Sequence, residues 1–191
     1  MKDLASHIMD IVQNSIRAEA QKIEITICED HGRDSFVIEI SDNGTGMDEE
    51  TLTRVRDPFF TSRTVRKVGL GIPLLQQNAE RTGGEVLISS QLGKGTKLKA
   101  IFTHSHLDRP PLGDMGETLG LLVAANPELH FIYKHSTDTG TYLFDTEEIK
   151  QVLEGVPLSH PDILPALQDM IRENLKEIEA DQPDLPSINQ K

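Results

Sequence analysis

The stretch Ile40-Ser-Asp-Asn-Gly-Thr-Gly-Met47 decides how the rest of the sequence is interpreted. It ends an alternating apolar segment (Phe36, Ile38, Ile40), which predicts a strand with one buried face. The strand therefore delivers one carboxylate, Asp42, to a segment whose glycines let the backbone come close to a ligand. Taken alone, Asp-Asn-Gly is more typical of an ordinary turn, so the remaining sequence must decide whether Asp42 faces a ligand.

The charge of the chain is unevenly distributed. The 191 residues carry a net charge of −12, to which residues 1–104 (13 Lys/Arg, 15 Asp/Glu) contribute −2 and residues 105–191 (6 and 16) contribute −10. This acidity argues against a general nucleic-acid-binding function. The sequence shows neither an apolar run of membrane-spanning length nor a signal peptide, so we expect a cytoplasmic protein. The single cysteine, Cys28, is interpreted as a small residue of the core or of a sheet.

Hydrophobic periodicity predicts helices that alternate with hairpins. Residues 3–20 carry an apolar stripe at spacings of three and four, which predicts a helix on which Asp10 and Asn14 lie one turn apart. We expect strands at 22–28, 35–42, 86–90 and 96–102, and helices at 48–55 and 70–82. This order indicates an α+β fold, a two-layer α/β sandwich with a mixed, largely antiparallel sheet covered by helices on one face.

The segment Arg109-Pro-Pro-Leu-Gly113 predicts a domain boundary. We expect a first domain over residues 1–104, a small acidic α/β appendage over 105–180 and a disordered tail over 181–191. Within the appendage, the pattern predicts helices at 115–125, 146–153 and 162–180, and strands at 129–134 and 141–144. Its acidity suggests a region that interacts with a protein partner.

Several polar motifs surround Asp42 in a definite order along the chain. They are Asp10-x-x-x-Asn14, Asp42-Asn-Gly-Thr-Gly46, Asp57-Pro-Phe-Phe-Thr-Ser62 with the basic segment after it, Gly69-x-Gly71 at a helix start, and Gly93-Lys-Gly-Thr96 before the last strand of the first domain. Each motif is weak alone, and none is a P-loop. Together, between residues 7 and 102, they closely resemble the GHKL superfamily of ATPases and kinases, which includes gyrase B, MutL, sensor histidine kinases and anti-sigma serine kinases.

The resemblance implies a Bergerat fold that binds ATP and Mg²⁺. Asn14 matches the asparagine whose side-chain oxygen holds the Mg²⁺ ion, and a neutral oxygen donor suits this hard cation. Asp42 matches the carboxylate that accepts a hydrogen bond from the adenine amino group. Thr96 matches the threonine that helps to hold the same base. Around the base, the resemblance also implies backbone contacts from Gly44, Gly46 and Met47.

The triphosphate side of the site is implied in the same way. Backbone N–H groups at a helix N-terminus form a ready anion site, and the residues expected to supply them are Gly69, Leu70 and Gly71. The basic residues of the family's lid correspond to Arg63, Arg66 and Lys67. Additional hydroxyl contacts are expected from Thr61 and Ser62.

Asp10 is the candidate catalytic residue. In ATP-hydrolysing and serine-kinase members of the superfamily, this position usually carries a glutamate that acts as general base. Asp10 has the right charge but is one methylene shorter, so the alternative is that it mainly positions Mg²⁺. His7, one turn earlier, is interpreted as structural, and His104-x-His106 as an exposed strand end rather than a metal site.

Three functions remain open at this level. The first is a stand-alone histidine- or serine-kinase-like protein that acts on a separate protein, because the first predicted helix leaves no room before it for a phosphoacceptor hairpin. The second is a non-catalytic nucleotide sensor, and the third a slow ATPase switch. Residues 109–115 also faintly resemble GHKL proteins encoded beside hydrogenase and NADH-dehydrogenase-like subunits, which implies such a partner.

Overall fold

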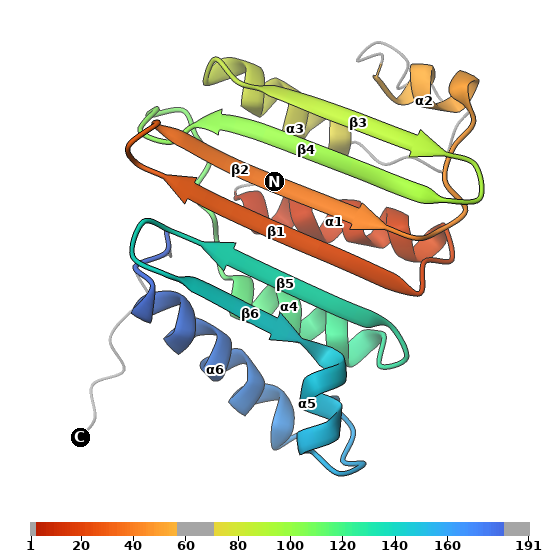
Figure 1. Ribbon diagram of the computed structural model, residues 1–191, viewed down its shortest axis with the longest axis vertical. Helices are drawn as coiled ribbons and strands as arrows, with labels where there is room; N and C mark the ends of the chain where they lie inside the picture. The colour runs from red at the N-terminus through yellow and green to blue at the C-terminus, as the bar shows by residue number, and fades with distance from the viewer. Residues whose placement is uncertain (1–2, 57–70, 182–191) are drawn as a thin grey trace.

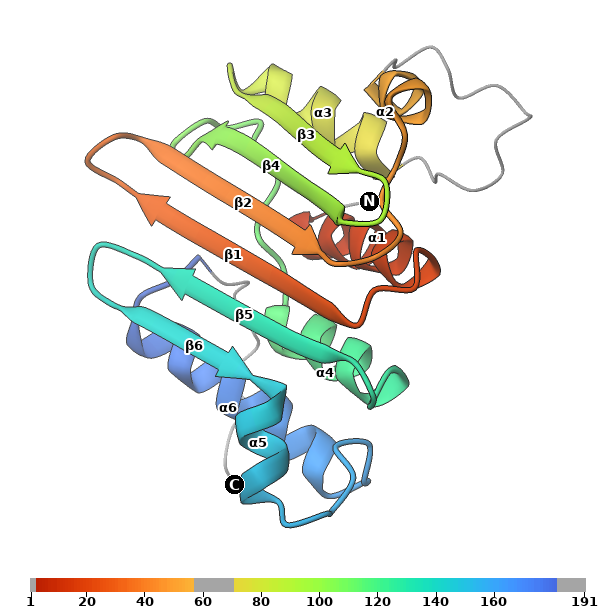
Figure 2. The same cartoon turned by 45° about the vertical axis from the view of Figure 1, so that its right-hand side comes forward.

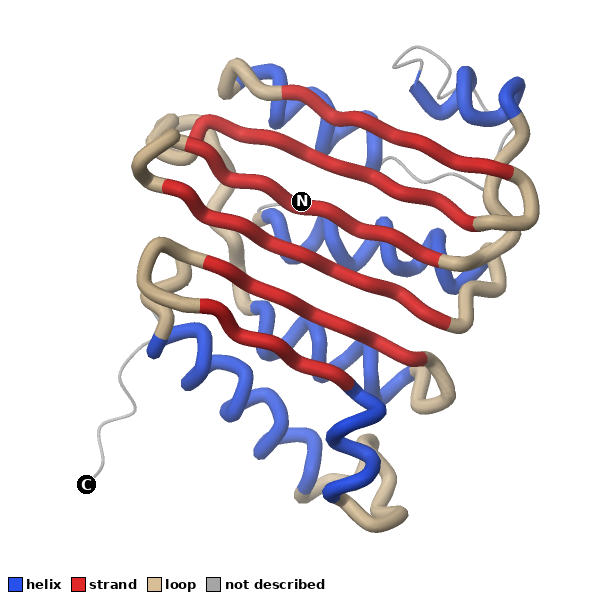
Figure 3. Tube along the Cα trace, viewed as in Figure 1, coloured by secondary structure: helices blue, strands red, loops and turns tan. Residues whose placement is uncertain are grey.

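The computed structural model describes residues 3–56 and 71–181. Its helices are α1 (Leu4–Arg17), α2 (Glu49–Arg56), α3 (Gly71–Arg81), α4 (Met115–Ala125), α5 (Thr146–Val152) and α6 (Ile163–Glu177). Its strands are β1 (Lys22–Asp30), β2 (Ser35–Asp42), β3 (Glu85–Gln91), β4 (Gly95–Thr103), β5 (His130–Ser136) and β6 (Thr141–Asp145). The strands form one sheet in the order β3-β4-β2-β1-β5-β6, which runs across the molecule in Figures 1 and 3.

The fold has two layers, as the sequence predicts. Figure 2 shows α1, α3 and α4 on one side of the sheet, and α6 packs against α4 near the β6 edge. The pairs β1–β2, β2–β4, β3–β4 and β5–β6 are antiparallel, and β1–β5 is parallel. The α+β class and the mixed, largely antiparallel sheet are therefore confirmed.

The position of strand β1 follows from the strict alternation of buried apolar residues with more exposed ones. Ile23, Ile25 and Ile27 are at most 1% exposed on the helix-covered face, where each removes a large apolar side chain from water. Cys28 points to the other face and is exposed, so it is a sheet residue but not a core residue. Glu29 continues the buried side of the alternation and is only 2% exposed.

Helix α1 starts and stops for local reasons. The Asp3 carboxylate accepts a hydrogen bond from the Ser6 N–H at 2.8 Å, which caps the first turn. The helix ends at Arg17, earlier than expected, because Glu19 adopts a left-handed conformation (φ 59°) that ends an α-helix. Its buried stripe, which includes Ile8 and Val12, packs on the sheet.

The residues after 104 extend the sheet rather than form a separate layer. Strand β5 pairs with β1 in parallel from Lys22↔His130 to Cys28↔Ser136, and one hydrophobic core contains residues from both parts of the chain. The Pro-Pro segment is also pinned, because the Leu4 N–H donates to the Pro111 carbonyl at 2.9 Å. The expected appendage thus belongs to the same packed unit.

A buried polar cluster holds the end of β1 that lies away from Asp42. The Glu29 carboxylate accepts hydrogen bonds from His135 Nε2 at 2.7 Å, His104 Nε2 at 3.0 Å and the Asp181 N–H at 2.9 Å. Burial opposes the charge of Glu29, but these donors outweigh it and lower its pKa to about 2. His104 is therefore not an exposed strand end, since its side chain is only 14% exposed.

The cluster also anchors the end of the described chain. Asp181, which we expected in a disordered tail, is held by Glu29 and by Arg109, whose Nη1 lies 2.8 Å from its carboxylate. Residues 182–191 lie outside the described residues. Within the described ranges, the chain forms no helix that is both long and apolar enough to cross a membrane.

Candidate nucleotide-binding site

A cavity of about 490 Å³ lies where α1 and α2 meet the ends of β2 and β4. Its walls are mainly apolar, with Ile11, Ile40, Val55, Ile72, Ile88 and Leu98 among the lining residues. Five of the predicted site residues also line it: Asn14, Asp42, Gly46, Met47 and Thr96. The fold therefore brings residues from distant parts of the sequence to one concave site.

The Asp42 carboxylate is held in place by neutral donors. Its Oδ1 accepts hydrogen bonds from the Gly44 N–H at 2.9 Å and the Thr96 N–H at 3.3 Å, and its Oδ2 accepts one from Ser15 Oγ at 2.6 Å. A carboxylate has about four acceptor positions, so one remains for a donor on a ligand. Asp42 is therefore both oriented and still able to bind.

Ser15 was missed by the sequence interpretation. Ser15 is only 4% exposed. It lies on the buried stripe of α1, three residues after Val12 and four residues after Ile11. A lone polar residue at a position where the helical period demands an apolar one was the signal that could have revealed it.

The glycines of the Asp42 segment are required by the packing of the loop itself. A Cβ on Gly44 would lie 2.6 Å from the Ala18 carbonyl oxygen, and one on Gly46 would lie 2.1 Å from the Gln91 carbonyl oxygen. Gly46 also has φ +65°, which favours glycine. These glycines let the segment fit between the end of α1 and the β3–β4 turn.

Ser90 is a second residue that the sequence interpretation missed. Its Oγ lies 2.9 Å from Thr96 Oγ1, accepts a hydrogen bond from the Met47 N–H at 2.8 Å and donates to the Gly95 carbonyl at 2.9 Å. Ser90 and Thr96 are cross-strand partners in the β3–β4 register, so only the strand pairing reveals the contact. Ser90 thereby positions both Thr96 and Met47 at the cavity.

The Asn14 oxygen already has a cationic neighbour. Arg17, one turn later on α1, donates from Nη1 to Asn14 Oδ1 at 2.8 Å, and both residues line the cavity. The oxygen expected to hold Mg²⁺ is thus bonded to a guanidinium, which would have to move before the ion could bind. The amide oxygen of Asn14 is of the right type for a hard cation, and the positive charge of Arg17 suits an anionic ligand in the cavity.

Asp10 lies beside the N-terminus of α3. A Cβ on Gly71 would be 2.9 Å from Asp10 Cβ and 3.0 Å from Asp10 Oδ2, so only glycine fits there without movement. His7 is 1% exposed, accepts a hydrogen bond at Nε2 from the Asn78 amide at 3.0 Å, and burial lowers its pKa. These features agree with a structural, neutral His7.

The remaining predicted site residues cannot be placed. Thr61, Ser62, Arg63, Arg66, Lys67, Gly69 and Leu70 lie outside the described residues, and only Gly71 of the helix-start motif is described. Their roles at the triphosphate stay predictions.

The fold and the cavity together define a nucleotide-binding domain of the α/β sandwich class. An apolar slot with one oriented carboxylate suits a flat base with an amino group, and the amide oxygen of Asn14 suits a metal beside phosphates. The family model for histidine kinase-, DNA gyrase B- and HSP90-like ATPases matches residues 2–108, more than half of the chain. The chain belongs to this family and carries its ATP-binding domain.

Curated relatives are kinases and sensor proteins. Sensor kinase CckA of Brucella abortus is 39% identical over 67 residues (35% of this chain, 7% of the relative). Sporulation kinase C of Bacillus subtilis is 29% identical over 93 residues (49% and 22%), and sensor protein DegM of a Bacillus strain is 34% identical over 91 residues (48% and 24%). The chain thus spans under a quarter of the length of each of these relatives.

A solved structure supports the fold. The N-terminal domain of a DNA repair protein matches with a TM-score of 0.50 and 20% identity, over 75% of this chain and 52% of that chain. At this identity the match bears on the fold alone.

Proposed function

We propose that this chain binds ATP with Mg²⁺ and transfers the γ-phosphoryl group to a side chain of a separate regulatory protein. The observation that carries the proposal is the Asp42 carboxylate, held by three neutral donors at an apolar cavity with one acceptor position left over. The relatives named above are kinases and sensor proteins, which supports phosphoryl transfer as the class of reaction.

Adenine recognition follows from the cavity. The amino group of the base would donate to Asp42, and the ring would lie against apolar side chains of the sheet such as Ile40, Ile88 and Leu98. A guanine carbonyl in place of that amino group would face the carboxylate with two acceptors opposed, which is unfavourable. The site therefore selects adenine over guanine nucleotides.

The Mg²⁺ ion would be held by Asn14 together with the phosphates. The ion supplies charge neutralisation at the transferring phosphoryl group. Arg17 would release Asn14 Oδ1 when the ion binds, which leaves its guanidinium close enough to contribute positive charge at the same side of the cavity. Both residues come from one turn of α1, so the helix fixes the positions of their backbones relative to each other.

The acceptor is proposed to lie on another protein. All seven histidines of the chain are described, and only His7 belongs to a helix, where it is buried and bonded to Asn78. A histidine acceptor attacks through a neutral nitrogen lone pair and needs little help from a base. A serine acceptor would instead require Asp10 to take the hydroxyl proton as ADP leaves.

A second candidate function is a non-catalytic nucleotide sensor. The observation that favours it is the packing of Asp10 against Gly71, since Asp10 is not among the residues that line the cavity. In this case nucleotide binding would change the packing of α3 against α1 without hydrolysis of ATP or transfer of its γ-phosphoryl group.

The acidic C-terminal part is proposed to contact the protein partner. Residues 105–191 carry a net charge of −10, and the described residues that line the cavity all come before position 99. Partner contact and nucleotide binding would then use separate surfaces of one sheet.

Incubation with γ-labelled ATP tests the proposal, with the purified protein alone and with an extract of the source organism. Label on a protein band in the extract supports the kinase, and its acid lability separates phosphohistidine from phosphoserine. Released phosphate without labelled protein supports an ATPase and contradicts the proposal. Saturable ATP binding without either product supports the sensor.

The variant Asp10→Asn separates the roles of Asp10. If a serine is the acceptor, the variant should lose about 10²–10⁴-fold in labelling rate, the usual contribution of a general base, while retaining ATP affinity. With a histidine acceptor, the labelling rate should change far less.

A further inference from the structure

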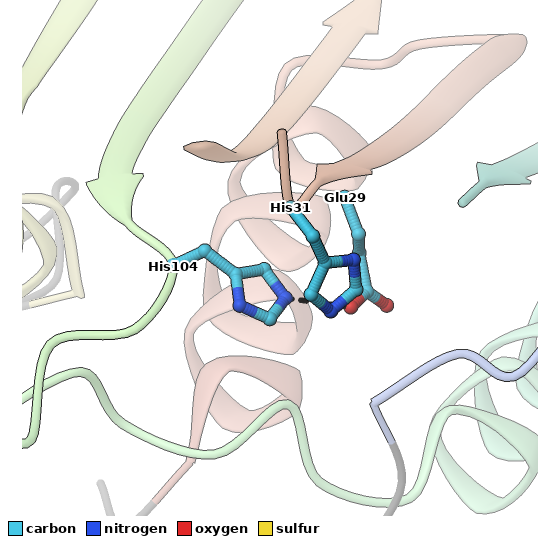
Figure 4. A group of neighbouring side chains, drawn as sticks. All are labelled: Glu29, His31 and His104. Atoms are coloured by element: carbon cyan, nitrogen blue, oxygen red, sulfur yellow. Dashed lines mark hydrogen bonds and ion pairs between the residues drawn. The ribbon is translucent and has the colours of Figure 1, made fainter. Parts of the chain in front are cut away.

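Three potential metal ligands converge at the end of the sheet opposite the cavity. Glu29 lies on β1, His31 lies in the turn that follows, and His104 lies just after β4 (Figure 4). One ligand atom of each residue lies within 4.8 Å of those of the other two. Asp42 pairs with Ile23, which lies six residues before Glu29 on β1. Glu29 and Asp42 are therefore about 20 Å apart along the strand direction. The group is therefore independent of the nucleotide site.

The donor set and its spacing suit a zinc ion. Two imidazoles and one carboxylate are common Zn²⁺ ligands at about 2.0–2.2 Å, which places the ligand atoms of a tetrahedral site about 3.3 Å apart. His104 Nε2 and Glu29 Oε2 are already 3.0 Å apart, and the rings of His31 and His104 lie side by side with centroids 4.2 Å apart. The 4.8 Å limit exceeds this spacing, so the ring of His31, which is on an exposed turn, must move closer to bind the ion.

The neighbours of these ligands orient them as they would around a metal. Asp138 Oδ2 lies 2.9 Å from His31 Nδ1, which places the ring hydrogen there and leaves the lone pair of Nε2 available. A carboxylate on the far nitrogen of a ligating histidine is the usual outer shell of a zinc site. Asp138 comes from the β5–β6 turn and also accepts a hydrogen bond from the His31 N–H at 3.2 Å.

Glu29 is oriented in the same manner. Its Oε1 accepts from His135 Nε2 at 2.7 Å and from the Asp181 N–H at 2.9 Å, which leaves Oε2 directed at His104. His135 is itself fixed by Tyr133, whose hydroxyl lies 2.6 Å from its Nδ1. Oε1 is thus used by two donors, whereas His104 is the one partner of Oε2 among the described contacts.

A purely structural cluster explains only part of this arrangement. His135, His104 and the Asp181 N–H already satisfy the buried carboxylate. His31 adds no hydrogen bond to Glu29 or His104 among the described contacts, and its side chain is 55% exposed. Its position against both ligands, with its Nδ1 held by Asp138, is what a third ligand requires.

We propose that Glu29, His31 and His104 form a Zn²⁺ site with a fourth coordination position open to solvent. The metal takes the place of the hydrogen that now lies between His104 Nε2 and Glu29 Oε2. It joins the β1–β2 turn to the segment that leaves β4 and, through Asp138, to the β5–β6 turn. Occupancy therefore stabilises the end of the sheet at which residue 181 is anchored.

Zinc titration of the full chain tests the proposal. The protein is treated with a chelator, dialysed and titrated with Zn²⁺ alone against a chromophoric competitor, with thermal unfolding as a second readout. We expect one tight Zn²⁺ per chain and a higher Tm with the metal. Absence of saturable binding in the micromolar range overturns the proposal.

The exposed ligand provides the decisive variant. His31→Ala should fold like the wild type because the side chain is largely in solvent, and it should bind Zn²⁺ at least about tenfold more weakly. His106→Ala is the matched control, since this exposed histidine lies two residues from His104 and outside the group. Equal affinity in His31→Ala and His106→Ala overturns the assignment and places any bound zinc elsewhere.

Asp138→Asn tests the orienting contact. An amide accepts more weakly than a carboxylate, so zinc affinity should fall by about tenfold with an unchanged stoichiometry. Unchanged affinity in this variant would contradict the role given to the His31–Asp138 pair.

Discussion

Two carboxylates, Asp42 and Glu29, lie on neighbouring strands at opposite ends of one sheet, and each is held by three donors. The donors of Asp42 are two backbone N–H groups and one hydroxyl, all neutral. Those of Glu29 are two imidazoles and one backbone N–H. Asp42 lines a cavity of about 490 Å³, whereas Glu29 is 2% exposed.

The difference shows how the same group can serve recognition or structure. Neutral donors orient a carboxylate without pairing it with an opposite charge, so Asp42 is oriented towards a ligand that enters the cavity. The imidazoles bonded to Glu29 can share charge with the carboxylate and are themselves metal ligands. Glu29 is therefore suited to holding the surrounding segments together. Removal of Asp42 should therefore impair binding, and removal of Glu29 should impair folding.

The largest expected effect is the destabilisation caused by Glu29→Ala. Two histidine side chains and one N–H would lose their buried acceptor, and breaking such a buried pair costs about 3–5 kcal/mol. Urea unfolding followed by circular dichroism measures the change in the free energy of unfolding. The matched control is Glu24→Ala on the same strand, where the half-exposed carboxylate pairs with Lys22. We expect that variant to change stability by about 0.5 kcal/mol or less.

A loss below about 1 kcal/mol in Glu29→Ala would show that water replaces the missing carboxylate. The proposed contrast between the two ends of the sheet would then fail at the structural end. Glu29→Gln sharpens the result, because it retains one acceptor oxygen and removes only the charge.

The second prediction concerns ATP affinity in Asp42→Asn. The amide retains the shape of the side chain, but its NH₂ group cannot accept from the adenine amino group. A hydrogen bond to a charged group is worth about 1.5–3 kcal/mol, so the Kd should rise by roughly tenfold to 150-fold. Calorimetric titration with ATP and Mg²⁺ measures this, and the free energy of unfolding should change much less than in Glu29→Ala.

Ser41→Ala provides the control for this experiment. Ser41 precedes Asp42 on β2, so its side chain points to the face opposite the cavity. It should retain the wild-type Kd. If Asp42→Asn also retains the wild-type Kd for ATP, the carboxylate does not form the proposed hydrogen bond with the adenine amino group.

Much of the fold could be predicted from local patterns. Alternation at Ile23, Ile25 and Ile27 and the stripe of α1 depend only on neighbours in the sequence, so both elements were predicted within a few residues. The parallel pairing of β1 with β5 could not be predicted, because it joins segments about a hundred residues apart and leaves no periodic signal. This is why residues after 104 looked like an appendage.

The site shows the same division. Asp42, Asn14 and Thr96 belong to motifs whose order resembles a known family, and the fold brings all three to the cavity. Ser90 is recognisable only from the β3–β4 register. The contacts of Glu29 with His104 and His135 span 75 and 106 residues, so spacing rules for metal ligands could not detect them.

The smallest predicted effect concerns a third carboxylate, Asp114, which has a structural partner and is not among the described residues that line the nucleotide cavity. It caps α4 by accepting from the Glu117 N–H at 2.9 Å and pairs with Arg172 Nη2 on α6 at 2.8 Å. Burial opposes its charge, but the hydrogen bonds from Arg172 and from the Glu117 N–H outweigh this and hold its pKa below the ordinary value. The stabilisation is therefore complete above the unfolded pKa of about 3.9 and is lost as the pH falls through the lower folded pKa.

Asp114→Asn isolates this charge because asparagine remains a good helix cap. At pH 7 the variant should be less stable by about 1 kcal/mol, a modest value for a largely shielded ion pair. The difference in the free energy of unfolding between wild type and variant should disappear below about pH 4. Asp108→Asn, in the exposed loop, should differ little from the wild type at either pH. Urea unfolding at a series of pH values measures both. A difference in the free energy of unfolding that persists at low pH would mean that Asp114 acts through its shape as a cap rather than through its charge. Asp114 and Glu29 would then be distinguished by burial alone.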